Sequence, residues 1–265
     1  KWEEKMFDVE STDLIMTYEK WLHSSLDRIN GRVKQKFQMA IDQVAFYMNA
    51  ILHNSKFQKE ARESLIREAQ VFSPVIHFIE DMKHLPLYQL QYISQKKVTS
   101  HRQISLIQGG LSGSGGLLLL GLDLPLQFAI NLHAIQSVAL TYGYDTSIPF
   151  EMVVILKVLR VSVLPKRLKS FAWKQLQEEI SDHDPYFYTE GDNIEDEVWL
   201  ERFIRQIGKT FLLGQLSKKF INGLPLLGIA TGAGFNYQFA KKVTRFAEYF
   251  YQKRFLLEKK GEIKW

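Results

Sequence analysis

Two titratable side chains stand alone in a very apolar stretch of this sequence. Residues 103–144 contain one acid, Asp123, one imidazole, His133, and no lysine or arginine in 42 residues. A carboxylate is costly to bury without a partner, and an imidazole titrates near neutral pH. The two groups could therefore serve acid–base chemistry in a hydrolase of peptides or lipids. The simpler interpretation is that Asp123 caps a helix just before Pro125 and that His133 is a hydrogen-bonded core histidine.

Polar side chains recur after Asp123 on one side of the helix that we expect from Pro125 to Tyr142. At 100° per residue they stay within an arc of roughly 120°. The polar stripe consists of Asp123, Gln127, Asn131, Ser137 and Thr141, with His133 on its flank. A mild polar stripe on an otherwise apolar helix is typical of a helix that faces water, a polar partner or a small cavity.

Other candidate motifs have the wrong spacing for their chemistry. Gly208-Lys209-Thr210 resembles the end of a phosphate-binding loop, but the first glycine of that loop would fall on Phe203. The serines of the GGLSGSGG segment lack the G-x-S-x-G pattern of a nucleophile elbow. The pattern H-E-x-x-H is absent, and the acidic run at 181–197 is predicted to be a solvated surface loop. We expect no metal and no cofactor, and the sequence assigns no catalytic residue.

The composition excludes several classes of protein. A chain of 265 residues with 46% hydrophobic and 24% charged residues can bury a sizeable core and is not disordered. Without cysteine it has no disulfide framework and no thiolate zinc site. A net charge of +5 is modest for a nucleic-acid-binding protein, so we expect no nucleic-acid partner. The first residues contain no long apolar run, which argues against a secretory signal.

Two apolar, glycine-rich segments are the strongest signal in the chain. Six glycines lie within residues 109–121, and residues 220–240 carry no charge. Each segment contains a G-x-x-x-G pair, beginning at Gly109 and at Gly228, which lets neighbouring backbones approach closely. Lysine pairs flank the second segment, and anionic headgroups attract such cations. We expect the segments to pack on each other and to contact a membrane or a partner within it. The predicted contact residues are Gly109, Gly113, Leu117, Leu118, Leu119, Leu120, Leu224, Leu226, Leu227, Gly228, Gly232, Lys218, Lys219, Lys241 and Lys242.

Apolar residues recur at three- and four-residue spacing along most of the chain, and this period predicts helices. The expected helices cover, approximately, residues 14–26, 33–52, 59–71, 75–82, 87–95, 125–142, 148–164, 166–174, 194–213 and 239–256. No strand alternation of convincing length occurs. We therefore expect an all-α protein with one multi-helix domain over residues 1–265, in which the glycine-rich segments form helical, membrane-inserting hairpins. Trp173 is expected to be exposed on a basic helix at a membrane surface.

The glycine-rich segments resemble the EcsC family. The resemblance is carried by GGLSGSGGLLLLGLDLPLQFAINLHAIQSVALTYGYD and by GLPLLGIATGAGFNYQFAKKVTRFAEYFYQKR. The segments KWEEKM and INGRVKQKFQMAI are similar to that family too, so the likeness covers most of the chain. The family's recurring positions correspond here to Gly110, Gly113, Gly116, Asp123, Pro125, Gly143, Gly232, Gly234 and Asn236. The family has no accepted catalytic residues, so the resemblance assigns none.

This resemblance implies a compartment and a partner. The founding member is encoded beside the ATPase, EcsA, and the membrane subunit, EcsB, of a bacterial ABC transporter linked to protein secretion, regulated proteolysis and peptide export. It implies a non-catalytic or regulatory accessory protein at the cytoplasmic side of the cell membrane, peripheral or partly inserted. Its partners would be the transporter subunits and the anionic membrane surface. Two alternatives stay open: a soluble helical scaffold that docks by its charged faces, and a hydrolase that uses Asp123 and His133.

Overall fold

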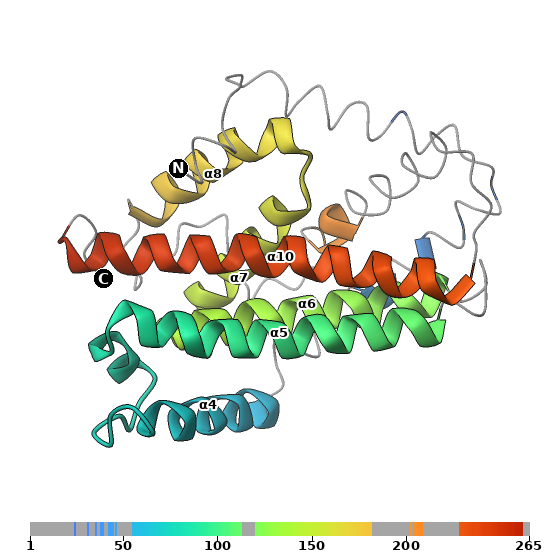
Figure 1. Ribbon diagram of the computed structural model, residues 1–265. Helices are drawn as coiled ribbons and strands as arrows, with labels where there is room; N and C mark the ends of the chain where they lie inside the picture. The colour runs from blue at the N-terminus through green and yellow to red at the C-terminus, as the bar shows by residue number, and fades with distance from the viewer. Residues whose placement is uncertain are drawn as a thin grey trace.

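The chain folds into a set of packed helices, as the apolar periodicity predicts. The computed structural model describes residues 55–112, 120–181, 204–208 and 228–261, together with single positions within residues 24–46 and at residue 202. Helices and no strands occur in these ranges, which confirms the all-α class. The elements are α4 (Ser55–Gln70), the 3-10 helix η1 (Glu80–His84), α5 (Leu87–Ser112), α6 (Leu120–Thr141), α7 (Pro149–Val163), α8 (Lys166–Ser181) and α10 (Gly228–Lys259), as Figure 1 shows.

Helix α6 lies among the other described helices. In Figure 1, α5, α6 and α10 run alongside one another, with α7 and α8 to one side and α4 to the other. α6 packs against α4, α5, α7 and α10. Of its described side chains, only that of Leu126 is exposed. A helix that is apolar on nearly every side must be buried, so the most apolar stretch of the chain forms core.

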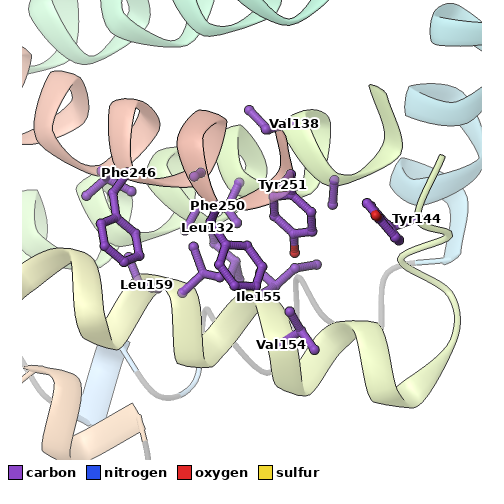
Figure 2. Packing of buried hydrophobic residues seen from close by; sticks show 14 of the residues in the cluster. Leu132, Val138, Tyr144, Val154, Ile155, Leu159, Phe246, Phe250 and Tyr251 are labelled. Carbon is purple, nitrogen blue, oxygen red and sulfur yellow. The ribbon is translucent and has the colours of Figure 1, made fainter. Parts of the chain in front are cut away.

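The core is largest where α6, α7 and α10 meet. Figure 2 shows Leu132, Ile155 and Phe250, one from each helix, in a single buried cluster. Trp173 of α8 closes this cluster, because its ring lies edge-on to Phe246 at 5.3 Å and to Phe250 at 5.8 Å between centroids. Only 2% of Trp173 is exposed. The prediction of an exposed tryptophan on α8 is therefore wrong, and the ring instead anchors α8 to the core.

Helix α6 ends at a left-handed glycine, directly after the helix expected at 125–142. Gly143 has a φ of 85°. Its N–H donates to the Leu140 carbonyl at 3.0 Å, and the Tyr144 N–H donates to the Ala139 carbonyl at 3.1 Å. These two bonds form a Schellman motif, which needs a positive φ that glycine adopts without strain. The turn brings the Tyr144 ring to 5.5 Å from that of Tyr251 on α10, measured between centroids.

Several predicted boundaries are wrong because helices continue through glycine and proline. The piece expected at 87–95 is the start of α5, which runs to Ser112. Pro125 was expected to begin a helix but lies inside α6, so Asp123 is within that helix and does not cap it ahead of the proline. In the segment expected to be helical at 75–82, the helix begins only at Glu80. A glycine inside a helix costs about 0.5–1 kcal/mol relative to alanine, and burial of helix faces outweighs that cost.

Other predictions concern parts of the chain that lie outside the described residues. These are the helix at 14–26, most of the helix at 33–52, the acidic loop at 181–197 and most of the helix at 194–213. Within the described ranges, no helix is both long enough and apolar enough to cross a lipid bilayer.

Candidate functional site

A polar layer joins α5, α6 and α10, at the place where the sequence predicts a polar stripe. Gln127 is 1% exposed, and its Nε2 donates to the Asn236 carbonyl at 3.3 Å and to Ser105 Oγ at 3.5 Å. The Asn236 amide in turn donates to Gln108 Oε1 at 3.1 Å. The stripe on α6 therefore faces polar partners on the two neighbouring helices.

Both glycine-rich segments contribute to this polar layer. Gln108 and Gln127 belong to the apolar stretch at 103–144 that contains the first glycine-rich segment, and Asn236 belongs to the second segment at 220–240. Beside them, the rings of Phe128 and Phe239 pack edge-on, with their centroids 6.0 Å apart. Described residues next to the glycine pairs therefore pack on each other as predicted, but the contacts shown are made by amide and phenylalanine side chains and not by the glycines.

The polar layer is incompletely paired at its centre. Asn131 is fully buried, and its Nδ2 donates to the Gln127 carbonyl of the same helix at 2.6 Å. The side-chain oxygens of Asn131 and Gln127 accept no hydrogen bond from the part of the chain that the structure describes. An unpaired buried polar atom costs about 1–3 kcal/mol. Stability alone therefore does not explain these two amides, whereas a role in fixing the register of the packed helices would.

Asp123 and His133 are too far apart to act as a catalytic pair. Ten residues separate them on α6, so their Cα atoms lie about 15 Å apart along the helix axis at 1.5 Å per residue. The His133 Nδ1 instead lies 3.1 Å from Gln136 Oε1, and burial lowers the pKa of His133. This is the hydrogen-bonded histidine that the sequence favours. The side chain of Asp123 lies outside the described residues.

A second histidine, which sequence reasoning missed, packs between α5 and α6. His101 Nε2 lies 3.1 Å from Ser137 Oγ. Burial lowers the pKa of His101 to about 4, and the neighbouring His133 and Lys97 add to this shift. The signature of an activated serine includes a third group that orients the imidazole, and none of the described carboxylates bonds to His101. The described residues also contain no group of three or more side chains suited to hold a metal ion.

The predicted contact residues divide between the core and the surface. Gly109 is buried, whereas Lys241 and Lys242 are exposed. Lys242 Nζ also donates to the Leu164 carbonyl at 3.5 Å, beside the turn between α7 and α8. Helical positions without a described side-chain environment are Leu120, Gly228 and Gly232. Positions outside the described residues are Gly113, Leu117, Leu118, Leu119, Leu224, Leu226, Leu227, Lys218 and Lys219. Contact of these residues with a membrane stays a prediction.

The largest group of exposed apolar side chains lies on α5 and on the loop before it. We call this group the α5 face. It holds nine of the fifteen large apolar side chains that are exposed among the described residues. Its members are Val71, Phe72, Val75, Phe78, Tyr88, Tyr92, Ile104, Leu106 and Ile107. Apolar spacing predicts helices at 75–82 and 87–95 but does not identify which of their apolar residues are exposed, so sequence reasoning missed this surface.

Helix α5 presents no acid to the solvent. Its exposed residues are Tyr88, Tyr92, Gln95, Lys96, Thr99, Ser100, Gln103, Ile104, Leu106 and Ile107. Lys96 is the only charged residue among them, and it pairs with Glu68 of α4. The absence of Asp and Glu over the whole helix was the signal in the sequence that could have identified this face. At 1.5 Å per residue, the α5 helix is about 39 Å long.

A buried ion pair holds α7 to α10 at some distance from the α5 face. Arg254 donates to the two carboxylate oxygens of Glu151 at 2.8 and 2.6 Å, and its guanidinium lies 3.9 Å from the Tyr144 ring centroid. Burial disfavours the charged guanidinium, but Glu151 outweighs this and raises the pKa of Arg254. Lys83 of η1 pairs with Glu258 of α10 at 2.9 Å. These contacts tie η1 and α7 to the last turns of α10.

Helix α8 directs one of its lysines inward. Lys169 is 3% exposed, and its Nζ donates to the Ser162 carbonyl at 2.6 Å near the end of α7. Burial lowers the pKa of Lys169 to about 6, and the nearby Lys242 adds to the shift. The sequence predicts that this basic helix lies on a membrane surface, and Lys169 is one of its cations that points into the protein instead.

The model of the EcsC protein family matches residues 1–256. Two proteins of Bacillus subtilis (strain 168) are similar to this chain. "Uncharacterized protein YdbA" is 26% identical over 204 residues, which cover 76% of this chain and 72% of that protein. "Protein EcsC" is 21% identical over 203 residues, which cover 77% of this chain and 79% of that protein. No solved structure matches. Because the family model spans nearly the whole sequence, this chain belongs to the EcsC protein family.

Proposed function

We propose that this protein is a non-catalytic, membrane-associated binding protein and an accessory of an ABC transporter of the Ecs type. The observation that carries the membrane part is the α5 face, with its nine exposed apolar side chains and no exposed acid on α5. The transporter part rests on the family resemblance, which implies EcsA- and EcsB-like partners on the cytoplasmic side of a bacterial membrane.

The chemistry of the α5 face favours contact with lipid. Transfer of a well-exposed side chain such as Val75 or Phe78 into an apolar phase contributes about 1.5–3 kcal/mol. Tyr88 and Tyr92 add amphipathic rings, which concentrate at membrane–water interfaces. Several such contacts together would hold the protein to a bilayer without a spanning helix.

The charges beside the α5 face are compatible with an anionic surface. Glu68 is shared by Lys96 and Lys97, so this group keeps one net positive charge. Lys241 and Lys242 are further exposed cations, but they lie on α10, and Lys242 is beside the turn between α7 and α8 and not beside α5. A cation near an anionic lipid surface contributes about 1 kcal/mol, so anionic lipid should strengthen a contact that apolar side chains make possible.

The polar layer supports binding over catalysis. Its amides contact one another across three helices, and the distance between Asp123 and His133 removes the pair on which a hydrolase would depend. The polar layer joins one side of α5 to α6 and α10. The opposite side of α5 therefore faces the solvent and carries the α5 face.

Flotation with vesicles of phosphatidylcholine and phosphatidylglycerol tests the membrane part. The wild-type protein should rise with the vesicles, and the double variant Val75→Glu/Phe78→Glu should stay at the bottom. Both positions are exposed, so the variant should fold. Gln175→Glu adds the same kind of charge at an exposed position on α8 and should float like the wild type. A wild-type protein that stays at the bottom contradicts the proposal and favours a soluble scaffold.

A pull-down from native membranes, before and after a carbonate wash, tests the transporter part. The expected result is recovery of an ABC transporter ATPase or membrane subunit, identified by mass spectrometry, with the wild-type protein as bait. Recovery of these subunits with the wild-type bait, and their absence when a control protein is the bait, supports the assignment. Membrane binding without either subunit would separate this protein from the transporter.

A further inference from the structure

The loop between α4 and α5 forms a projecting apolar tip. Residues 71–79 read VFSPVIHFI and contain no Asp, Glu, Lys or Arg. Val71, Val75 and Phe78 are 82%, 72% and 68% exposed, and Phe72 is 38% exposed. We call these four residues the apolar tip. Figure 1 shows this loop at one corner of the molecule, where α4 ends and η1 leads into α5.

The apolar tip is held on a fixed backbone. Asp81 Oδ2 accepts the N–H groups of His77 at 2.8 Å and of Phe78 at 2.9 Å, and these bonds lower the pKa of Asp81. Ile76 and Ile79 lie between the exposed residues in sequence and are fully or almost fully buried. The exposed side chains are therefore presented by an ordered loop, and binding through them avoids much of the cost of ordering a flexible segment.

Polarity increases in steps behind the apolar tip. Tyr88, Tyr92 and Lys96 follow at four-residue spacing on the outer side of α5, about 6 Å apart along the helix, and all three are exposed. Phe72 connects the tip to this row, because its ring lies edge-on to that of Tyr92 at 6.0 Å between centroids. Arg67 is exposed in the last turn of α4. The order of apolar, tyrosine and cationic side chains is the order of polarity across the edge of a bilayer.

We propose that the apolar tip inserts into the outer part of a bilayer, with Tyr88 and Tyr92 at the level of the headgroups and Lys96 among the phosphates. This inference rests on the proposed membrane association and identifies where the chain enters the lipid. Glu80 and Asp81 follow the tip directly and limit insertion to a shallow depth, because a carboxylate is costly to place in hydrocarbon. A groove on a partner protein would also bind apolar side chains, but it would not require the polarity to increase stepwise from the apolar tip through the tyrosines to Lys96.

Single labelled cysteines test this inference, because the chain has no cysteine of its own. An environment-sensitive nitrobenzoxadiazole label is attached at Val75→Cys, Phe78→Cys, Ile107→Cys or, as a control on α8, Lys174→Cys. Each replaced side chain is exposed or half-exposed, and a thermal melt confirms that each variant folds. The labels at positions 75 and 78 should brighten several-fold and shift to the blue with phosphatidylcholine–phosphatidylglycerol vesicles. Quenchers carried on the lipid chains should reduce that signal, and the control label should not respond.

The other outcomes separate this inference from the function on which it rests. If the protein floats and only the label at position 107 responds, the membrane association stands and the apolar tip is not the point of entry. If the protein does not float and no label responds, both proposals fail. If the tip labels respond to native membranes but not to protein-free vesicles, a membrane protein occupies the tip and the lipid assignment is overturned.

A pair of substitutions at one position gives an independent readout. Phe78→Glu should weaken vesicle binding by about tenfold or more, since burial of a phenylalanine contributes about 1.5–3 kcal/mol. Phe78→Trp should keep the wild-type affinity, because it preserves an apolar ring at the same place. Equal binding by both variants would contradict insertion of the tip.

Discussion

Helices α5 and α6 lie side by side but distribute their polar and apolar residues in opposite ways. α6 has the most apolar sequence of the described helices and is buried, and its few amides point toward α5 and α10. α5 has a balanced composition, yet it exposes a row of apolar side chains and keeps Ser105 and Gln108 near the polar layer. Mean hydropathy therefore identifies the core of this protein, whereas the candidate contact surface lies on the less apolar helix.

The largest expected effect compares the same substitution on these two helices. Ile135 of α6 is fully buried, and Ile107 of α5 is 63% exposed. Ile135→Ala should lower the free energy of unfolding by about 2–5 kcal/mol, because it removes buried methyl groups and leaves a cavity. Ile107→Ala should change it by less than about 0.5 kcal/mol. Urea denaturation of the two variants measures both values. Equal losses would mean that the exposed face of α5 is covered in the folded protein.

A smaller effect is expected from pH at the interface between α5 and α6. Burial lowers the pKa of His101 to about 4, from an ordinary value of 6.5. Between these values the unfolded chain binds the proton and the folded chain does not, so stability should fall as pH drops from about 6.5 toward 4. The loss should be about 3 kcal/mol, at about 1.36 kcal/mol for each pH unit between the two pKa values. His101→Gln should flatten this part of the profile measured by thermal melts. An unchanged slope would show that other groups cause the acid sensitivity.

The smallest effect of this series is expected at the end of α6. Gly143→Ala should cost about 1–2 kcal/mol, because a residue with a Cβ is strained in the left-handed conformation. The added Cβ would also lie 2.5 Å from Lys83 Cγ, which must move. Gly234→Ala is the matched control, since nothing lies within 4 Å of a Cβ built there. It should be neutral or slightly stabilising in a helix. If Gly143→Ala leaves the free energy of unfolding unchanged, strain at this turn is excluded.

The sequence predicts the helical class and parts of the polar layer because both depend on local patterns. The stripe of Gln127 and Asn131 follows from 100° steps along one helix, and Gly143 is a typical helix stop. The positions of Pro125 and Trp173 could not be predicted in the same way. Pro125 lies inside α6, and Trp173 is buried by Phe246 and Phe250, because neighbouring helices decide both outcomes.

The α5 face could not be predicted because α5 carries two apolar rows. Leu90 and Ile93 are buried, whereas Tyr88 and Tyr92, which also recur at helical spacing, are exposed. Periodicity shows that a helix has an apolar row but does not say which row its neighbours cover. The loop before α5 has the same ambiguity, since Val75 is exposed and the adjacent Ile76 is fully buried.

The most direct test of this account is to measure stability and vesicle affinity on the same two variants. Ile135→Ala should be less stable than the wild type but should bind phosphatidylcholine–phosphatidylglycerol vesicles equally well at a temperature where it is folded. Val75→Glu/Phe78→Glu should melt like the wild type and bind at least about tenfold more weakly. Equal vesicle binding by the wild type and the double glutamate variant would contradict a membrane contact through the α5 face.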